Sequence, residues 1–65
     1  MKLIGMIDVY GEAVKLFWDG VSVWAAKEEC GDCSTFSEAV EYCVKSWEDD
    51  EWDLQFTKEA ARTLD

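Results

Sequence analysis

The clearest pattern of apolar and polar positions lies between residues 35 and 48. Apolar residues recur there at spacings of three and four and form one helical stripe, made up of Phe36, Ala39, Val40, Cys43, Val44 and Trp47. Thr35 and Glu38 have the spacing of a capping box at the start of the stripe. On the polar side, Glu41 and Lys45 lie one turn apart and are expected to form an ion pair. The pattern predicts a helix over residues 35–48 that packs against a second layer.

The first 27 residues alternate with a period of two, which is typical of strands. Strands are predicted over residues 2–10, 13–18 and 21–27, with two-residue turns at Gly11-Glu12 and Asp19-Gly20. This register would pair Ile7 with Leu16 and Leu16 with Val23. It would place one set of residues on the face that meets the helix: Leu3, Gly5, Ile7, Val9, Val14, Leu16, Trp18, Val21, Val23 and Ala25.

The reverse face of these strands is less polar than a solvated face usually is. It carries Ile4, Met6, Tyr10, Phe17 and Trp24 among Asp8, Lys15 and Ser22, with Lys15 expected beside both Asp8 and Trp24. Large apolar side chains gathered on one face indicate a covered surface. Met6, Tyr10, Phe17 and Trp24 are therefore candidates for a homodimer or a second partner contact. The alternative is that they are scattered surface residues, some of them covered by the C-terminal segment.

The rest of the chain completes a small α+β domain over residues 1–65. Residues 28–34 are predicted to form a loop, and Trp52, Leu54 and Phe56 alternate with polar residues as in a fourth strand. Thr57 can cap a short last helix in which Ala60, Ala61 and Leu64 face inward. The predicted architecture is a three-stranded antiparallel meander packed on one amphipathic helix, followed by a fourth strand and a short C-terminal helix.

Charge narrows the classes of partner. Fifteen acidic residues face six basic ones, with no histidine, so the formal net charge is −9. Direct binding to nucleic acid or to an anionic membrane is disfavoured, because both need Lys and Arg. A partner with a basic surface is favoured, and the alternative is that acidity only keeps a small protein soluble.

The N-terminus does not read as a signal peptide, and three cysteines cannot all pair with one another. We therefore expect a cytoplasmic protein with reduced thiols.

Cys30-Gly31-Asp32-Cys33 is the sharpest local motif. With the apolar run over residues 21–26 before it and a helix after it, it resembles the active-site segment of the thioredoxin family. That resemblance implies a thiol activated by the N-terminus of the helix, whereas the neighbouring acids would disfavour a thiolate. Zinc is the other interpretation, but Cys30, Cys33 and Cys43 supply three sulfurs where a structural site needs four ligands. Without histidine there is also no nucleophilic triad. We expect neither enzymatic activity nor a cofactor or bound metal.

An acidic run between two tryptophans is the strongest candidate for partner binding. It comprises Trp47, Glu48, Asp49, Asp50, Glu51, Trp52 and Asp53. Carboxylates on a small rigid domain can take the positions of nucleic-acid phosphates against Arg and Lys, and tryptophans can anchor the contact. The alternative is a solvated acidic turn.

Two resemblances bear on function. In size, acidity and build the chain is similar to phage-encoded anti-CRISPR proteins and other DNA-mimic inhibitors. That likeness implies that it blocks the basic nucleic-acid-binding surface of a defence complex in the bacterial cytosol. Three strands leading into Thr35-Phe36-Ser37-Glu38-Ala39 also resemble HicB-type antitoxins, which implies a regulatory protein-binding module.

Overall fold

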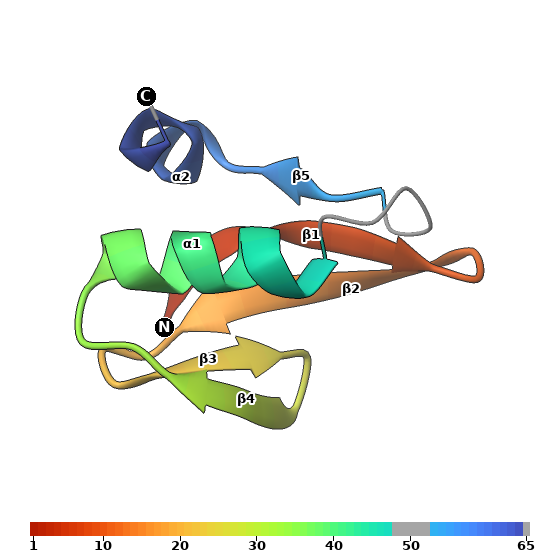
Figure 1. Cartoon of the computed structure of the whole chain (residues 1–65). Helices are drawn as coiled ribbons and strands as arrows, with labels where there is room; N and C mark the ends of the chain where they lie inside the picture. The colour runs from red at the N-terminus through yellow and green to blue at the C-terminus, as the bar shows by residue number, and fades with distance from the viewer. Residues whose placement is uncertain (48–52, 65) are drawn as a thin grey trace.

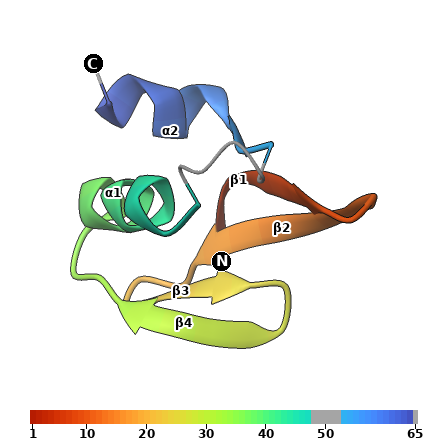
Figure 2. The ribbon, with the colours of Figure 1, turned by 45° about the vertical axis from the view of Figure 1, so that its right-hand side comes forward.

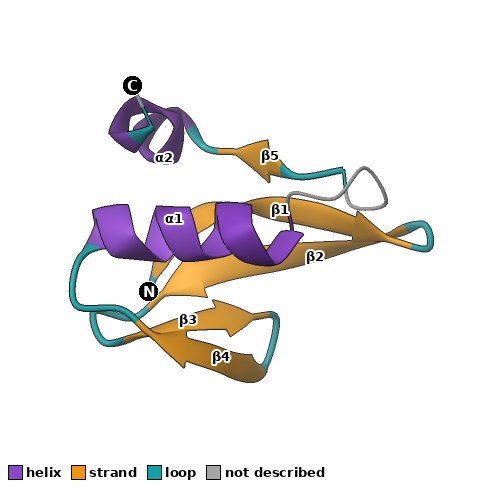
Figure 3. Ribbon diagram, in the orientation of Figure 1, coloured by secondary structure: helices purple, strands orange, loops and turns teal. Residues whose placement is uncertain are grey.

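The fold is a five-stranded antiparallel sheet with two helices on one side of it (Figures 1 and 2). A computed structural model describes residues 1–47 and 53–64. The elements are β1 (Lys2–Val9), β2 (Glu12–Trp18), β3 (Ser22–Ala25), β4 (Glu28–Asp32), α1 (Phe36–Trp47), β5 (Gln55–Phe56) and α2 (Lys58–Thr63), coloured by type in Figure 3. The strand order is β4-β3-β2-β1-β5. The predicted α+β class is confirmed, with one more strand than expected.

The β1–β2 hairpin turns one residue earlier than predicted. Tyr10 and Gly11 form the turn, with φ values of 51° and 88°, as a type I′ hairpin turn requires. Asp8 supports the turn by accepting a hydrogen bond from the Gly11 N–H at 3.0 Å. Ile7 consequently pairs with Val14, two residues away from the predicted register. Because the shift is an even number, the side chains in this part of the hairpin keep their predicted faces.

A bulge near the start of β1 corrects the predicted placement of two residues. The register shifts between Leu3, which pairs with Phe17, and Gly5, which pairs with Leu16. The extra residue, Ile4, is fully buried in the core, although the pattern placed it on the reverse face. Leu3 was predicted in the core and is instead 40% exposed. One extra residue in one strand reverses the faces of the residues before it.

The connection between β2 and β3 is wider than the predicted two-residue turn. Trp18 pairs with Val23, so four residues lie between the paired positions. Asp19 shapes this turn, since its Oδ1 accepts hydrogen bonds from the backbone N–H groups of Val21 and Ser22 at 2.8 and 2.6 Å. Val21 is 66% exposed as a result, and its predicted place in the core is wrong.

The segment predicted as a loop over residues 28–34 contains a strand. The chain reverses at Ala26, which has a φ of 55°, and returns as β4 along the outer edge of β3. Four strands therefore precede α1, where three were expected. A second bulge, opposite Val23 and Trp24, interrupts this pairing. The motif from Cys30 to Asp32 thus lies on an edge strand rather than in a loop.

α1 confirms the predicted helix and its Thr35 cap, whereas the Glu38 side chain bonds the N–H of Ser34 and not that of Thr35, as the predicted capping box requires. The Glu38 N–H donates to Thr35 Oγ1, and Glu38 Oε2 accepts from the Ser34 N–H, both at 3.1 Å. The stripe buries Ala39, Val40 and Cys43 fully and Phe36, Val44 and Trp47 partly. All of these residues except Val44 belong to or pack against the core cluster that includes Ile4, Ile7, Leu16 and Val23 of the sheet. In the described part of the chain, no ion pair joins Glu41 to Lys45.

The C-terminal segment forms the other edge of the sheet. β5 pairs with β1, and Thr57 caps α2 by accepting a hydrogen bond from the Ala60 N–H at 3.1 Å. Ala60 is buried as predicted, whereas Ala61 and Leu64 are exposed, because a helix of six residues buries only a narrow stripe. Lys2 ties α2 to the sheet through an ion pair with Glu59 at 2.7 Å. None of the helices described here is long and apolar enough to cross a membrane.

Candidate interaction surface

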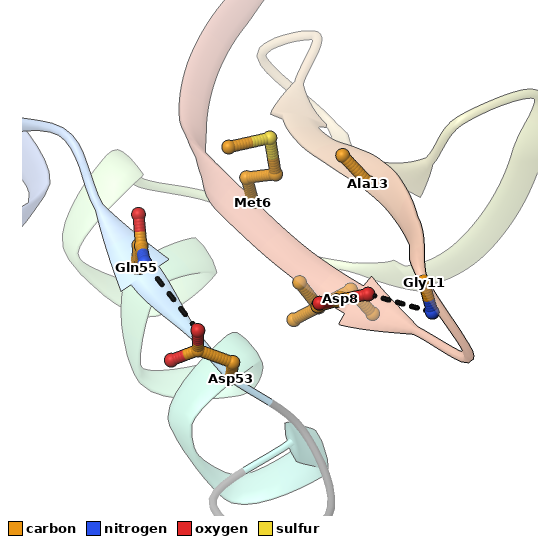
Figure 4. Close-up of a pocket in the computed structure, with 7 residues that line it drawn as sticks. Met6, Asp8, Gly11, Ala13, Asp53 and Gln55 are labelled. Carbon is orange, nitrogen blue, oxygen red and sulfur yellow. Dashed lines mark hydrogen bonds between the residues drawn. The ribbon is translucent and has the colours of Figure 1, made fainter.

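Most of the predicted acidic run falls in a segment that the structure does not describe. Residues 48–52 lie outside the described residues. At one end, Trp47 is the last residue of α1 and is half-buried against Tyr42, with 6.3 Å between the ring centroids. At the other end, Asp53 is exposed just before β5, and its Oδ2 accepts a hydrogen bond from Gln55 Nε2 at 3.5 Å (Figure 4).

The sheet face opposite the helices is uncovered in the described structure. We call it the open face, and its central side chains are Leu3, Met6, Lys15, Phe17 and Trp24. Both helices lie on the other side of the sheet, and β5 extends the edge of the sheet without folding over this face (Figure 2). Within the described residues, β5 and α2 do not provide the cover by the C-terminal segment that was the alternative raised from the sequence.

Three of the four residues predicted for a second contact lie on the open face. Met6 is 37% exposed, and Phe17 and Trp24 are half-buried cross-strand neighbours that do not pack on the core. Leu3 joins them because the β1 bulge turns it outward, and the sequence pattern missed it. Tyr10 does not belong to the group. It sits at the tip of the β1–β2 turn and is 98% exposed, because the turn includes it.

The charged neighbours on this face also differ from those expected. Lys15 pairs with Met6, and Asp8 pairs with Ala13, so the predicted neighbours of Lys15 are wrong. The β1–β2 register is shifted by two residues, which separates Lys15 from Asp8, and the β2–β3 register is also shifted by two, which pairs Trp24 with Phe17. Trp24 has Glu29 as its cross-strand neighbour instead.

Trp24 is held in place by an aspartate. Its indole Nε1–H donates to Asp19 Oδ2 at 2.8 Å, while the other oxygen of Asp19 accepts the two backbone hydrogen bonds of the turn. These bonds lower the pKa of Asp19, with the Ser22 N–H as the largest cause and the Trp24 indole next. Because a charged acceptor strengthens such bonds, Asp19 both carries a negative charge and fixes the indole.

The β4 bulge brings two more carboxylates to the same end of the open face. Residues three apart in a regular strand point to opposite faces. With the extra residue between them, Glu29 lies opposite Trp24 and Asp32 lies opposite Ser22, on one face. Ser22 Oγ–H donates to Asp32 Oδ1 at 3.0 Å. Trp24 is therefore bordered by Asp19, Glu29 and Asp32. No local sequence pattern predicts this group of carboxylates.

The other end of the open face is hollowed. One hollow of about 160 Å³ is lined by Met6, Ile7, Asp8, Gly11, Ala13, Asp53 and Gln55 (Figure 4). A second, of about 220 Å³, is lined by Leu3, Gly5, Met6, Lys15, Gln55, Phe56 and Thr57. Both are smaller than typical small-molecule pockets. They suit single side chains of a partner better than a cofactor.

A wider hollow lies on the helix side of the sheet. It measures about 540 Å³, and its floor includes Ile7, Val9, Val14 and Ala25, with Trp47 at its border. The sequence pattern did not predict this hollow. α1 ends before the far half of the β1–β2 hairpin (Figure 1), and Val9, Val14 and Ala25 are only partly buried.

The cysteines do not form the arrangement that the thioredoxin resemblance implies. Cys30 is exposed, Cys33 and Cys43 are buried, and all three thiols are free. A strand holds the motif, and α1 begins only at Phe36, so no thiol sits at its first turn. Burial raises the pKa of Cys33, with Glu38 and Asp32 adding to the shift, and burial raises that of Cys43 to about 12. A reactive thiol needs the opposite shift.

Metal ligation finds no support in the same region. Among residues 1–47 and 53–64, no three or more Cys, Asp or Glu side chains are grouped so that they could hold a metal ion.

Comparison with protein-family models, with curated proteins and with solved structures found no match.

The acidic side chains of the described residues are exposed to solvent. Ten lie in the described residues, and each is exposed: Asp8, Glu12, Asp19, Glu28, Glu29, Asp32, Glu38, Glu41, Asp53 and Glu59. Within those residues, Glu59 alone forms an ion pair. Apart from Glu59, the carboxylates of the described residues therefore display their negative charge without an ion-pair partner there.

Proposed function

We propose that this protein is a non-enzymatic inhibitor that binds a basic, nucleic-acid-binding surface of a host defence complex of the CRISPR–Cas kind. It acts in the bacterial cytosol, and its carboxylates take the positions of nucleic-acid phosphates. The partner is a protein or complex and not a nucleic acid, because the net charge of −9 repels phosphates.

The exposure of the described carboxylates carries this proposal. All ten of them face solvent, and Glu59 alone among these ten forms an ion pair. The long-range electrostatic field of the molecule therefore remains strongly negative. Such a field accelerates association with a basic surface and opposes association with acidic ones. The raised thiol pKa values add indirect support, since they leave Cys33 and Cys43 unsuited to thiolate chemistry.

The test is a pull-down from bacterial lysates that express nucleic-acid-targeting defence complexes, at low and high salt. The variant Asp49/Asp50/Glu51→Lys reverses the charge of the acidic run. We expect the wild type to capture a nucleic-acid-binding complex, to release it in high salt and to compete with its nucleic acid. The variant should lose that capture.

A matched variant separates the acidic run from total charge. Glu12/Glu28/Glu41→Lys changes the net charge by the same amount at exposed residues whose carboxylates make no hydrogen bond or ion pair within the described structure. The proposal expects this control to retain most of the binding. Equal capture by wild type and by the Asp49/Asp50/Glu51→Lys variant would refute mimicry by the acidic run.

A further inference from the structure

We propose that the open face is a docking surface for an arginine-bearing apolar patch on a partner protein, with one guanidinium stacked on Trp24 beside Glu29. The residues at the proposed contact, Trp24 and Glu29, are not members of the acidic run, so the proposal is tested independently of nucleic-acid mimicry.

The open face has the composition of a protein contact. Its centre holds Leu3, Met6, Phe17 and Trp24, all at least partly exposed, and its two ends carry carboxylates. An aromatic and methionine centre inside a charged rim is the usual anatomy of a protein–protein interface. The small hollows beside Met6 offer places for side chains of the partner.

Trp24 is prepared to receive a cation. The bond to Asp19 holds the indole by its edge, at 2.8 Å, and fixes the ring before binding. Cations bind over the face of a tryptophan ring, and arginine does so more often than lysine. Glu29, the cross-strand neighbour of Trp24, is exposed and can pair with the same guanidinium.

Charge excludes a second copy of this chain as the occupant. One end of the open face carries Asp19, Glu29 and Asp32, and the other carries Asp8 and Asp53. Lys15 is the one base among the central side chains. Two copies packed face to face would bring carboxylates together at both ends, and like charges in contact oppose binding. A partner with an apolar centre and arginines around it complements the face.

The experiment uses isotope-labelled full-length protein and a pentapeptide that alternates leucine and arginine. NMR titration should shift the Trp24 indole N–H and the Met6 methyl signals. The Trp18 indole N–H, which donates to the Cys33 carbonyl at 2.9 Å on the helix side, serves as the internal reference and should stay still. A citrulline analogue, which keeps the shape without the charge, should bind about tenfold more weakly.

Two single-residue variants locate the contact. Glu29→Gln should weaken binding of the arginine peptide about threefold, whereas Glu28→Gln, an equal charge change one residue away, should not. Trp24→Leu should abolish the preference for arginine over citrulline, with the Trp18 signal reporting that the fold persists. Equal affinity for both peptides, shifts confined to α1, or no shift at millimolar peptide would overturn the proposal. So would open-face signals that depend on protein concentration without peptide, since these would show self-association.

Discussion

Gly5→Ala is the sharpest test of how the sheet is closed at its β5 edge. Gly5 of β1 lies opposite Phe56. A Cβ at Gly5 would stand 2.2 Å from the Gln55 carbonyl oxygen, which belongs to backbone and cannot rotate away. The substitution must therefore push β5 off β1 or bend β1 in the core.

The expected loss is large for a chain of this size. Overpacking costs about 1–3 kcal/mol, and each backbone hydrogen bond lost between the strands adds about 1 kcal/mol. Replacing a strand glycine with alanine returns about 0.5–1 kcal/mol through the unfolded chain. We expect a net loss of about 2–4 kcal/mol. At about 0.05–0.15 kcal/mol per residue, the free energy of unfolding for 65 residues is roughly 3–10 kcal/mol, so much of it would be removed.

Urea denaturation and amide hydrogen exchange measure this effect. The Thr57 N–H, which donates to the Ile4 carbonyl at 3.0 Å, should lose protection, while the Cys33 N–H, bonded to Val21 at 2.8 Å, should lose less. Gly31→Ala is the matched control. Its Cβ would meet the Tyr42 ring at 2.8 Å, and a side chain can move, so about 1 kcal/mol is expected. The reasoning is refuted if Gly5→Ala unfolds within about 0.5 kcal/mol of wild type with Thr57 still protected.

Three further predictions concern caps, a buried bond and pH. Thr35→Ala removes the oxygen that accepts the Glu38 N–H, so a loss of about 1 kcal/mol in urea is expected, and Thr35→Ser should restore it. Trp18→Phe leaves the Cys33 carbonyl without the indole N–H that donates to it. We expect the free energy of unfolding in urea to fall by about 1–3 kcal/mol. Unchanged stability would contradict this hydrogen bond. The Cys43 thiol has a pKa raised from 9.0 to about 12 in the fold, so the unfolded chain loses its proton first. The stability from the neutral thiol is full below pH 9 and falls towards pH 12. Thermal melts should show a shallower decline for Cys43→Ala, and an unchanged slope would exclude Cys43 as the cause.

The sequence was sufficient to predict those helices and strands whose periodicity and capping residues lie within a few neighbouring positions. The helical stripe with the Thr35–Glu38 capping box predicted α1, and Thr57 predicted the start of α2. The period-two pattern predicted the β1–β2 hairpin and most of its faces. These predictions held because helix periodicity, caps and strand alternation depend on neighbours in the chain.

β4 escaped prediction for the opposite reason. Residues 28–32 show no alternation, since Glu28, Glu29 and Cys30 are all exposed on an edge strand. What stabilises the strand is distant: pairing with β3, and the Tyr42 hydroxyl of α1, which donates to the Cys30 carbonyl at 3.2 Å. Neither contact can be predicted from the apolar and polar pattern of residues 28–32.

For the candidate surfaces, the sequence by itself determined composition: the negative charge, the acidic run and the apolar residues of the reverse face. Only the tertiary structure decided which of them meet. The β1 bulge moved Leu3 out and Ile4 in, and the β4 bulge set Asp32 opposite Ser22, on the same face as Glu29 and Trp24. The physical reason is that a single extra residue reverses the facing of a strand, and its position depends on how two distant segments pair and pack, not on the residues at the bulge alone.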